Sequence, residues 1–401
     1  MKILIVSKMF YHRGGAEVVA IAERDMLRAA GHDVQVYAMH HPENLPLEEA
    51  PSWAPEIRFG GSLSGNIKAF ERLMGWGDVV SSFHRVLVKA QPDVVHFHNI
   101  HSYLSPVVVS LARKFGARTV WTLHDLKLVC PAYLGRRPDG SLCTDCIDGQ
   151  RNLMKYRCMK GSRFASLMAL LEAMRWNRRK LSAATDCFIA PSAFMKSMMV
   201  RGGFDGSKIQ VLHNFIAPEK LRAILSAPEA AEEEEPYFAY VGRLSSEKGV
   251  KTLVKAAVRA GVALKIGGDG PLLPELQEIA AGSKVEFLGR LDGVRVINLL
   301  RGAAASVMPS ECFENNPLSV IESLCAGTPV IGANIGGIPE LIQPGINGEH
   351  FPSGSVETLA AKLACFNPEA YDRKDISARS IADFSESTHL EKLLKIYSLK
   401  A

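Results

Sequence analysis

The sequence contains no uninterrupted apolar run of the roughly 18–20 residues that a helix needs to cross a membrane. It also lacks a signal-peptide pattern at its start, because Ser7 and Lys8 end the short apolar run of MKILIVSKMF and no small-residue cleavage site follows. We therefore expect a cytoplasmic protein. A reducing compartment in turn argues against disulfide bonds among the eight cysteines.

The sequence also lacks a large excess of charge of either sign. The 47 lysines and arginines are nearly matched by 42 aspartates and glutamates, which leaves a formal net charge of +5 over 401 residues. This is weak evidence for an anionic ligand and poor evidence for nucleic acid. The glycine-rich turn GGDGP at 267–271 lacks the G-x-G-x-x-G spacing of a dinucleotide fingerprint, which argues against a nicotinamide cofactor.

The sequence does contain a regular alternation of short apolar runs with helical patterns. At 401 residues the chain is too long for one core, so we expect two domains of about 150–200 residues each. Strands that alternate with helices indicate βαβ units and parallel sheets covered on both faces. We expect strands at residues 2–7, 32–39, 93–99, 118–125, 187–192, 209–214, 237–243, 263–269, 284–289, 305–310 and 329–334.

The alternation begins twice, and the segment between the two halves is rich in Ala, Pro and Glu. We assign residues 1–216 to a first Rossmann-like domain, 217–236 to a solvated connection and 237–387 to a second such domain. Residues 388–401 contain a last helix, over about 389–398. The predicted fold class is α/β, with two doubly wound domains facing across a cleft and ligands at the carboxyl ends of the strands.

Two glutamates flank an Asn-Asn-Pro step in SECFENNPLSVIES, residues 310–323. Asn316 is suited to cap the following helix and Pro317 to its first position, where free N–H groups favour a phosphate. Glu314 precedes the helix and Glu322 lies about one and a half turns inside it. Both carboxylates can accept hydrogen bonds from sugar hydroxyls, and the alternative is that both are ordinary surface glutamates.

A second cluster, VGRLSSEKGV at 241–250, places Arg243 and Lys248 in a loop between a strand and a helix. Two cations in such a loop can hold a diphosphate and neutralise the charge that develops on a leaving group. The alternative is a surface cluster of these two residues with Glu247.

The first half of the chain offers two further candidates. HRGGAE at 12–17 places Gly14 and Gly15 just before a helix, where a ligand can approach the backbone closely. TLHD at 122–125 ends a strand with His124, and both a substrate contact and a core position remain open for this histidine.

Taken in order, these motifs resemble those of the retaining glycosyltransferases of family 4, and the resemblance spans nearly the whole chain. The motifs that carry it are Gly14-Gly15-Ala16-Glu17, Thr122-Leu123-His124-Asp125, Gly242-Arg243 with Glu247-Lys248-Gly249, Gly268-Asp269-Gly270-Pro271, Pro309-Ser310, Glu314 with Glu322, and Ala326-Gly327-Thr328-Pro329-Val330.

The resemblance implies a GT-B fold in which the second domain binds a UDP- or GDP-sugar without a catalytic metal and the first faces the acceptor. It also implies that the final helix returns to the first domain. The implied site residues are Arg243 and Lys248 on the diphosphate, Glu322 on the ribose, Glu314 on the transferred sugar, His124 near its anomeric carbon, Gly14 and Gly15 on phosphate or acceptor, backbone groups of Asn316, Pro317 and Leu318 around the phosphates, and the region of Arg290 at the base.

The step Asn315-Asn316 departs from the E-x-F-G form of many members at the position where the sugar binds, so the identity of the sugar stays open. The anomeric configuration of the sugar can be retained in two ways. Either a covalent enzyme intermediate forms, or the leaving phosphate departs from the same face of the sugar that the acceptor attacks. Because no carboxylate in the first half stands out as a nucleophile, we favour same-face attack. The departing phosphate would accept the proton of the acceptor hydroxyl, while Arg243 and Lys248 stabilise its charge.

Four cysteines are concentrated in one segment with the spacing C-x12-C-x2-C-x11-C, namely Cys130, Cys143, Cys146 and Cys158. This pattern is typical of a four-thiolate zinc site, and a metal would hold together a loop with few apolar residues. Unligated thiols, an iron–sulfur cluster and disulfides are the alternatives. The insert is expected on the acceptor side of the cleft. The other cysteines are expected in the core, namely Cys187, Cys312, Cys325 and Cys365.

Residues 155–180 are rich in Lys, Arg, Met and aromatic residues. One helical face carries apolar residues while the basic residues gather at the ends, the apolar set being Phe164, Leu167, Met168, Leu171 and Met174. We favour a packed helix over an interfacial helix on anionic lipid. Peripheral contact with the inner face of the plasma membrane remains compatible with an enzyme that acts on a lipid-linked acceptor.

The leading interpretation is a retaining hexosyltransferase that moves a sugar from a nucleotide-diphosphate sugar to a glycan or lipid-linked glycan in surface polysaccharide, lipopolysaccharide or glycolipid biosynthesis. A nucleotide-sugar epimerase, or another enzyme of this fold that acts on the donor alone, is the alternative, and an assay of the donor alone separates the two. A catalytically inactive binding protein is a third class. The base, sugar, acceptor and linkage depend on loops rather than on the fold.

Overall fold

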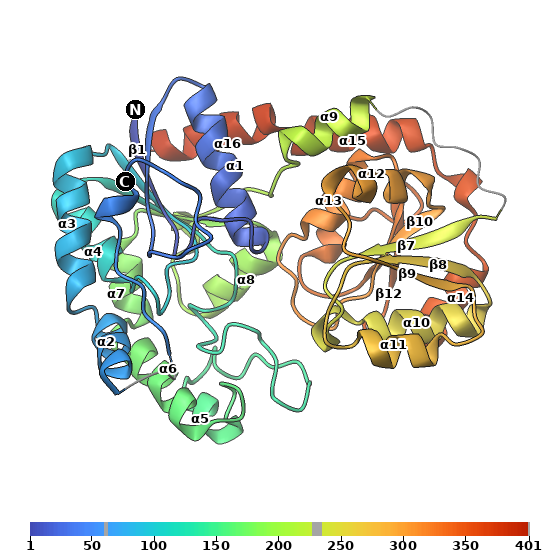
Figure 1. Ribbon diagram of the computed structural model, residues 1–401, viewed down its shortest axis with the longest axis horizontal. Helices are drawn as coiled ribbons and strands as arrows, with labels where there is room; N and C mark the ends of the chain where they lie inside the picture. Colours follow the sequence, from blue (N-terminus) through green and yellow to red (C-terminus); the bar gives the residue numbers. More distant parts are fainter. Residues whose placement is uncertain (60–62, 227–234, 400–401) are drawn as a thin grey trace. The chain divides into compact units, whose positions relative to one another are not determined.

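The computed structural model describes residues 1–59, 63–226 and 235–399, which form two compact units. Unit 1 consists of Met1–Leu212 together with the C-terminal residues from Leu390 onward, and unit 2 consists of His213–His389 (Figure 1). The last helix therefore contributes its second part to unit 1.

Unit 1 is built on a six-stranded parallel sheet with the order β2-β1-β3-β4-β5-β6. The order reverses at β1, since the chain adds β2 on one side of this strand and then returns to add β3 on the other. Such a switch point opens a crevice at the carboxyl ends of the strands. The strands are β1 (Lys2–Val6), β2 (Asp33–Tyr37), β3 (Val94–Phe97), β4 (Arg118–Thr122), β5 (Cys187–Ala190) and β6 (Ile209–Val211).

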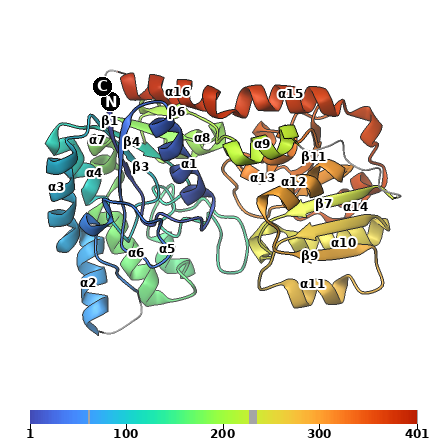
Figure 2. The ribbon, with the colours of Figure 1, turned by 45° about the horizontal axis from the view of Figure 1, so that its top comes forward.

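Helices cover both faces of this sheet, with α3 and α4 on one side and α1 on the other (Figures 1 and 2). Covered faces explain why the strands are continuous apolar runs rather than alternating ones. The helices of unit 1 are α1 (Gly15–Ala29), α2 (Leu63–Met74), α3 (Asp78–Ala90), α4 (Val107–Phe115), α5 (Asn152–Tyr156), α6 (Arg163–Arg175), α7 (Arg178–Ala184) and α8 (Ala193–Arg201).

Unit 2 repeats this architecture with a six-stranded parallel sheet of order β12-β11-β10-β7-β8-β9. Its switch point lies between β7 and β10, because the chain first adds strands on one side of β7 and then on the other. The strands are β7 (Tyr237–Val241), β8 (Ala263–Gly267), β9 (Val285–Gly289), β10 (Ala305–Met308), β11 (Val330–Ala333) and β12 (Gly348–Phe351).

The second sheet is also covered on both faces, by α10 and α14 on one side and by α12 and α13 on the other (Figure 1). Its helices are α9 (Pro218–Ser226), α10 (Val250–Ala260), α11 (Leu273–Ile279), α12 (Gly293–Gly302), α13 (Leu318–Cys325), α14 (Val356–Ala364), α15 (Arg373–Phe384) and the start of α16 (Glu386–Ser398). Short 3-10 turns are η1 (Ala50–Ser52), η2 (Gly206–Lys208), η3 (Ser246–Lys248), η4 (Ile338–Glu340) and η5 (Pro368–Ala370). Across the described residues, none of the helices combines the length and the apolar character that spanning a bilayer requires.

The predicted α/β class with two Rossmann-like domains is confirmed, and every strand expected from the sequence is present. Most strands end a few residues earlier than expected, because their last predicted residues belong to the loops of the candidate sites. The sequence analysis missed β12, whose four residues GEHF are half polar and form an edge of the sheet.

The predicted connection over 217–236 is partly a helix, because Pro218–Ser226 fold as α9. Ile224 of this helix is buried in the core of unit 2, and Leu221 packs against the same core. The amphipathic spacing of these residues outweighs the Ala/Pro/Glu-rich composition on which the connection was based. Residues 227–234 of the predicted connection lie outside the described residues.

The basic segment 155–180 is not one packed helix. Gly161, with φ of +69°, precedes α6, and the large apolar side chains of α6 lie on its outer side. Phe164 is 72% exposed and Met174 is 60% exposed, whereas the buried side carries small or polar residues, namely Ser166, Ala169 and Glu172.

Three of the four cysteines expected in the core are buried, but Cys365 is exposed at the end of α14.

Candidate functional site

In unit 2, a lysine and a glutamate meet at the switch point between β7 and β10. Lys248 ends the η3 turn after β7, and Glu314 lies in the loop after β10. The Nζ of Lys248 is 2.6 Å from Oε1 of Glu314, and the hydroxyl of Ser310 donates to the same oxygen at 2.9 Å. The predicted phosphate-binding cation and the predicted sugar-binding carboxylate therefore contact each other.

This pair is partly buried, with 29% of the Lys248 side chain and 14% of the Glu314 side chain exposed. Burial by itself favours the neutral amine, but the adjacent Glu314 carboxylate outweighs it and raises the pKa of Lys248 above its usual value. Lys248 is consequently protonated at neutral pH, and its ammonium group lies where an anionic ligand can take the place of Glu314.

Glycines let the backbone close around this pair. Gly249 has φ of +65°, and a Cβ at this position would lie 1.8 Å from the carbonyl oxygen of Pro309. Gly336 faces the Glu314 carbonyl in the same way at 2.2 Å, and the amide of Gly337 donates to that carbonyl at 2.7 Å. Only glycine permits these approaches, so the loops that carry Lys248 and Glu314 have defined positions.

The GGDGP turn has a packing role that needs no nucleotide. A Cβ at Gly268, with φ of +144°, would lie 1.9 Å from the Gly242 carbonyl oxygen. A Cβ at Gly270 would lie 2.4 Å from the Leu244 carbonyl oxygen. These glycines allow the turn after β8 to pack against the loop that carries Arg243.

The structure corrects the predicted start of α13. The helix begins at Leu318, and Pro317, with φ of −70° and ψ of 122°, occupies the capping position without a side-chain cap. Asn316 is only 4% exposed, and its Oδ1 accepts the backbone N–H of Asn214 at 2.8 Å. The Asn214 side chain returns a bond to the Asn316 carbonyl at 2.7 Å. Asn316 thus anchors the entry of the chain into unit 2, and the first-turn amides of α13 keep their capacity for an anion.

Glu322 is paired with a lysine from α9, the helix that the sequence analysis missed. The Nζ of Lys220 is 2.5 Å from Oε1 of Glu322, which is 7% exposed. Burial raises the pKa of Glu322, and the charge of Lys220 opposes this effect. The role of Glu322 toward a ribose stays a prediction, and Lys220 is a further polar group beside it.

The two arginines assigned to the donor site are both exposed. Arg243 is exposed in the loop after β7. Arg290 is exposed at the end of β9, which is separated from β7 by β8 in the sheet. The structure therefore places these guanidinium groups at the surface of the carboxyl edge of the sheet, where their predicted roles stay predictions.

In unit 1, Gly14 and Gly15 form the N-terminus of α1. Gly14 has an extended backbone with φ of −158°, which any residue can adopt. A Cβ at Gly15 would meet nothing within 4 Å, and one at Gly14 would only touch Glu17 Oε2 at 3.4 Å. Local packing does not require glycine at either position, which is consistent with space reserved for a ligand.

Charged side chains gather near these glycines, at the carboxyl ends of β1 and β4. The Nζ of Lys8 is 3.9 Å from Oε1 of Glu17, and Asp125 Oδ1 accepts the backbone N–H of Lys127 at 2.9 Å. Burial lowers the pKa of Lys8 and raises the pKa of Asp125, while each of these two charges favours the charged form of the other. Lys8 was assigned no role from the sequence, although it directly follows the predicted strand over 2–7.

His124 lies beside a buried group of histidines that the sequence analysis also missed. Its Nε2 is 3.0 Å from Nδ1 of His98, and the two rings stack with centroids 5.3 Å apart. His96 and His98 alternate along the end of β3, and Glu23 of α1 lies against both. The spacing H-x-H at a strand end was the available signal for this cluster. Burial lowers the pKa of His124 well below its usual value, so its ring is neutral.

The four cysteines of the insert are neighbours in the structure. The thiols of Cys130 and Cys146 interact, which lowers the pKa of Cys130 and raises that of Cys146, and the nearby Cys143 and Cys158 also raise the pKa of Cys146. The thiols are nevertheless more loosely gathered than a closed metal site. Among the described residues, the group with three donor atoms within 4.8 Å of one another is Glu23, His96 and His98.

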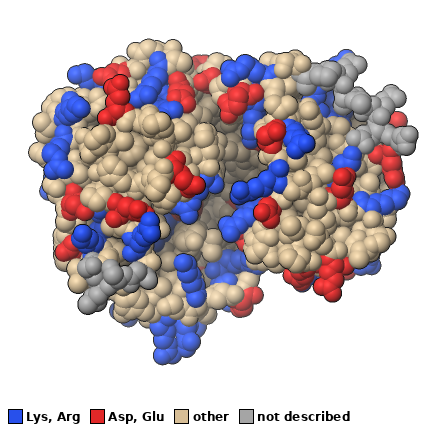
Figure 3. Space-filling view, viewed as in Figure 1, with Lys and Arg blue, Asp and Glu red and all other residues tan. Residues whose placement is uncertain are grey.

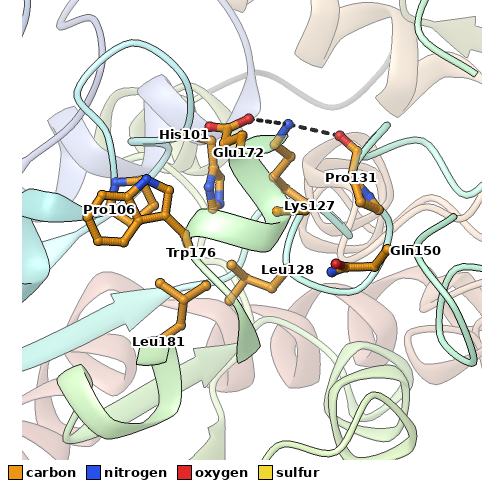
Figure 4. A pocket seen from close by; sticks show the side chains of 10 residues that line it. His101, Pro106, Lys127, Leu128, Pro131, Gln150, Glu172, Trp176 and Leu181 are labelled. Atoms are coloured by element: carbon orange, nitrogen blue, oxygen red, sulfur yellow. Dashed lines mark hydrogen bonds and ion pairs between the residues drawn. The ribbon is translucent and has the colours of Figure 1, made fainter. Parts of the chain in front are cut away.

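A small cavity of unit 1 lies under the insert and is lined by residues that include His101, Gln150 and Trp176 (Figure 4). Its volume of about 20 Å³ suits roughly one water molecule and excludes a sugar. At its wall, Lys127 Nζ is 2.9 Å from Glu172 Oε2, and both side chains are less than 10% exposed. This buried ion pair joins α6 to the loop after β4, and Lys127 also donates to the Pro131 carbonyl of the insert, so the cavity belongs to the packing of unit 1.

Two family models match this chain. Residues 13–220 match the family described as "Glycosyltransferase Family 4", and residues 222–380 match "Glycosyl transferases group 1". The first match covers about half of the chain, and the two together extend over nearly all of it.

Individual proteins agree with these models. The chain is 30% identical over 196 residues to the sulfoquinovosyl transferase SQD2 of Arabidopsis thaliana. This alignment covers 46% of this chain and 38% of that protein. The match thus spans about two fifths of this relative, as it does for the glycogen synthase of Mycobacterium tuberculosis, to which the chain is 33% identical over 171 residues. Among solved structures, Anabaena HepE in complex with UDP aligns with a TM-score of 0.67 at 18% identity, over 99% of this chain and 100% of that one. The lipopolysaccharide outer core galactosyltransferase WaaB aligns with a TM-score of 0.66 at 18% identity, over 99% of both chains.

Proposed function

Because the chain belongs to the glycosyltransferases of family 4 and has their GT-B fold, we propose that it is a retaining hexosyltransferase. In this proposal the donor is a nucleotide-diphosphate sugar, and the acceptor is a glycan or lipid-linked glycan of a surface polysaccharide or glycolipid. The fold shared with a UDP complex supports the donor, and the fold shared with a lipopolysaccharide galactosyltransferase supports the acceptor class.

The contact between Lys248 and Glu314 is the observation that carries the proposal. A cation and a carboxylate are held together at the switch point of unit 2, where ligands of doubly wound sheets bind. A donor offers complementary groups to both, because its diphosphate pairs with the ammonium and its sugar hydroxyls donate to the carboxylate. Binding would exchange the internal ion pair for these two interactions.

We assign the remaining donor contacts to the other predicted site residues. First-turn amides of α13, beginning with Leu318, would complete the phosphate site together with Arg243. Glu322 would accept ribose hydroxyls beside Lys220, and the region of Arg290 would meet the base. His124 and the backbone at Gly14 and Gly15 would contact the transferred sugar and the acceptor.

For the chemical step we favour departure and attack on the same face of the sugar. The bond between the anomeric carbon and the diphosphate oxygen breaks, and the acceptor oxygen bonds to the same face of that carbon. The leaving phosphate takes the acceptor proton, while Lys248 and Arg243 stabilise the developing negative charge. A covalent enzyme intermediate is the competing route to retention.

The test is an incubation with a panel of nucleotide sugars and acceptor glycans, followed by NMR of the product. The proposal expects sugar transfer with the anomeric configuration of the donor retained. Conversion of the donor in the absence of any acceptor would favour the alternative, a nucleotide-sugar epimerase. Inversion of the configuration would contradict the retaining mechanism.

We also propose that Cys130, Cys143, Cys146 and Cys158 hold a structural zinc ion. Four thiols in one insert supply the donor set that zinc prefers, and the interaction with Cys146 already lowers the pKa of Cys130. Closing the site requires the thiols to draw together. Metal analysis of the purified protein tests this, with one zinc per chain expected and its loss in Cys143→Ser. A metal-free protein of normal stability would contradict it.

Peripheral contact with a membrane is proposed for the outer face of α2 and α6, which pack against each other. The two helices and the turn after α2 expose large apolar side chains, namely Ile67, Phe70, Trp76, Phe164, Leu167 and Met174. Exposed basic residues lie beside them, namely Lys155, Arg157, Lys160 and Arg163, and Figure 3 shows Lys and Arg side chains over α5 at the lower edge of unit 1. Sedimentation with anionic vesicles should exceed that with neutral vesicles, and Phe164→Ser should reduce it. Equal sedimentation with both would contradict the proposal.

A further inference from the structure

Beneath His124, unit 1 contains a buried chain of polar contacts that the proposed reaction does not use. His124 Nε2 is 3.0 Å from His98 Nδ1, and His98 Nε2 is 3.4 Å from Oε2 of Glu23. His98 and Glu23 are each only 1% exposed. The chain therefore runs from a carboxylate inside unit 1, through one imidazole, to the histidine assigned to the sugar.

A second arm of the cluster fixes its geometry. His96 Nδ1 is 2.8 Å from the hydroxyl of Tyr397 in α16, and His96 Nε2 is 2.7 Å from the hydroxyl of Thr122. The rings of His96 and His98 have centroids 4.3 Å apart. Because both ring nitrogens of His96 are hydrogen-bonded, its ring has a fixed orientation, and the ring of His98 packs against it.

Glu23, His96 and His98 also have the spacing of a metal site, so this alternative needs an answer. The nitrogens that face Glu23 are His96 Nδ1, which hydrogen-bonds to the Tyr397 hydroxyl at 2.8 Å, and His98 Nε2, which has no hydrogen-bond partner among the described residues. A metal would have to displace the Tyr397 hydroxyl from His96 to gain the three protein ligands that a catalytic site provides. We therefore favour a cluster of polar contacts over a metal centre.

The protons of this network follow from the chemistry of its members. An ionised carboxylate only accepts hydrogen bonds, so a lone pair on His98 Nε2 facing Glu23 would be repelled and a proton there is favoured. A neutral histidine carries one ring proton, which leaves a lone pair on His98 Nδ1. That lone pair accepts the proton on His124 Nε2, and the outer nitrogen of His124 is consequently unprotonated.

We propose that Glu23 is a positioning residue that, through His98, holds His124 in the tautomer with its proton on Nε2 and its lone pair on Nδ1. The side chains of α1 and β3 thereby decide which kind of hydrogen bond His124 offers a ligand. The functional consequence rests on the proposed function: His124 Nδ1 accepts a hydrogen bond from a hydroxyl of the transferred sugar instead of donating one.

The experiment is NMR of the full-length protein labelled with 15N-histidine, with the His124 signals assigned by their absence in His124→Gln. The proposal expects the wild-type protein to show a protonated Nε2 and an unprotonated Nδ1 at His124. Glu23→Gln replaces the carboxylate by an amide that can donate to His98 Nε2, and a change in the His124 tautomer population is expected. Tyr397→Phe is the matched control, because it removes a hydroxyl from the same cluster but leaves the Glu23–His98 contact, and it should not change the tautomer.

Kinetics supply a second readout. Glu23→Gln should lower kcat by roughly tenfold or more with little change in the KM for the donor, as expected when a second residue no longer orients a contact residue. If Glu23→Gln does not fold, His98→Asn is used, because its side-chain oxygen can replace Nδ1 as the acceptor and should keep the His124 tautomer. His98→Leu should lose it.

The proposal is overturned by a proton on Nδ1 of His124 in the wild type, by an unchanged spectrum in Glu23→Gln, or by a stoichiometric metal bound through Glu23 and His98. The NMR result does not depend on turnover. A protein with the expected tautomer but no transferase activity would therefore refute the proposed function and leave this inference standing.

Discussion

The Nζ of Lys248 lies 2.6 Å from Oε1 of Glu314, although the two residues are 66 positions apart in the sequence. Each follows a different strand at the switch point of unit 2, and each neutralises the charge of the other. A ligand that binds Lys248 must therefore displace Glu314 or share the ammonium with it. In the proposed function this would couple phosphate binding to the release of the carboxylate assigned to the sugar.

Removal of the lysine should weaken nucleotide binding. We expect Lys248→Ala to reduce the affinity for a nucleoside diphosphate by roughly ten- to a hundredfold, since a hydrogen bond to a charged group contributes about 1.5–3 kcal/mol. Isothermal titration with UDP and GDP measures this. Lys251→Ala is the control, because Lys251 forms an exposed pair with Glu275 and should leave the affinity unchanged. Equal affinities of Lys248→Ala and the wild type would count against the site.

Removal of the carboxylate should separate binding from transfer. Glu314→Gln keeps the shape of the side chain but no longer competes for Lys248, so nucleotide affinity should be unchanged or higher. Transfer should fall, because the hydroxyls of the donor sugar lose a charged acceptor. The measurement pairs calorimetry with initial rates, and a parallel loss of both quantities would show that Glu314 supports the loop instead of the sugar.

The closure of the loops around this pair predicts a contrast between two glycines with similar backbones. Gly249 and Gly261 have φ of +65° and +68°, but a Cβ meets the Pro309 carbonyl at Gly249 and nothing within 4 Å at Gly261. Gly261→Ala should destabilise the protein by about 1–2 kcal/mol through backbone strain alone. Gly249→Ala should cost clearly more and weaken nucleotide binding. Urea denaturation compares them, and equal losses of stability would contradict the close approach.

A pH-dependent contribution to stability is expected from Asp186, in unit 1. Although burial alone would raise its pKa, hydrogen bonds from the amide and hydroxyl of Thr119 and the charge of Arg113 lower the pKa of Asp186 below its usual value. A lowered pKa stabilises the fold above the unfolded-state value of about 3.9, and this contribution is lost as the pH falls through the folded-state value.

Asp186→Asn should therefore destabilise the protein by about 1–3 kcal/mol at pH 7 and equally at pH 5. The difference from the wild type should shrink only below about pH 4. Denaturation curves across this range measure it. Asp25→Asn, at a side chain that is 58% exposed, is the control and should have little effect at any pH. A difference that already disappears between pH 7 and pH 5 would contradict the assigned pKa direction.

Arg178 should hold the cysteine-rich insert on unit 1. Its guanidinium donates to four backbone carbonyls, those of Val129, Cys146, Ile147 and Gly202. Arg178→Met removes all four donors and should increase hydrogen exchange across residues 130–158, because buried carbonyls without partners destabilise the closed state. Arg179→Met, at an exposed neighbour, should leave exchange unchanged. Unchanged exchange in Arg178→Met would mean that the thiols or a metal hold the insert without it.

The sequence predicted the fold well because both sheets are covered on two faces, so their strands are continuous apolar runs. It failed where the signal depends on partners far away in the chain. Asn316 was expected to cap α13, yet its side chain is used by Asn214, about a hundred positions earlier. The Ala/Pro/Glu-rich composition likewise predicted a solvated connection where α9 forms, and Lys220 of this helix pairs with Glu322.

The residues of the candidate site were predictable from local motifs, whereas their contacts with distant parts of the chain were not. Lys248 and Glu314 were each identified from local motifs, but their contact depends on the order of strands in the sheet. The cluster around His98 was missed because Glu23 and Tyr397 reach it from the two ends of the chain. The apolar face of α6 was visible in the sequence, whereas the direction in which it points was not.

A thermal-shift measurement with a panel of nucleoside diphosphates and nucleotide sugars tests the central claim most directly. At a ligand concentration of a hundred times Kd, binding to the folded state adds about 2.7 kcal/mol of stability. The account predicts that at least one member of the panel raises the Tm of the wild-type protein and that Lys248→Ala loses most of this increase. A panel without any effect on the wild type, or an equal increase in Lys248→Ala, would contradict a donor site built on Lys248 and Glu314.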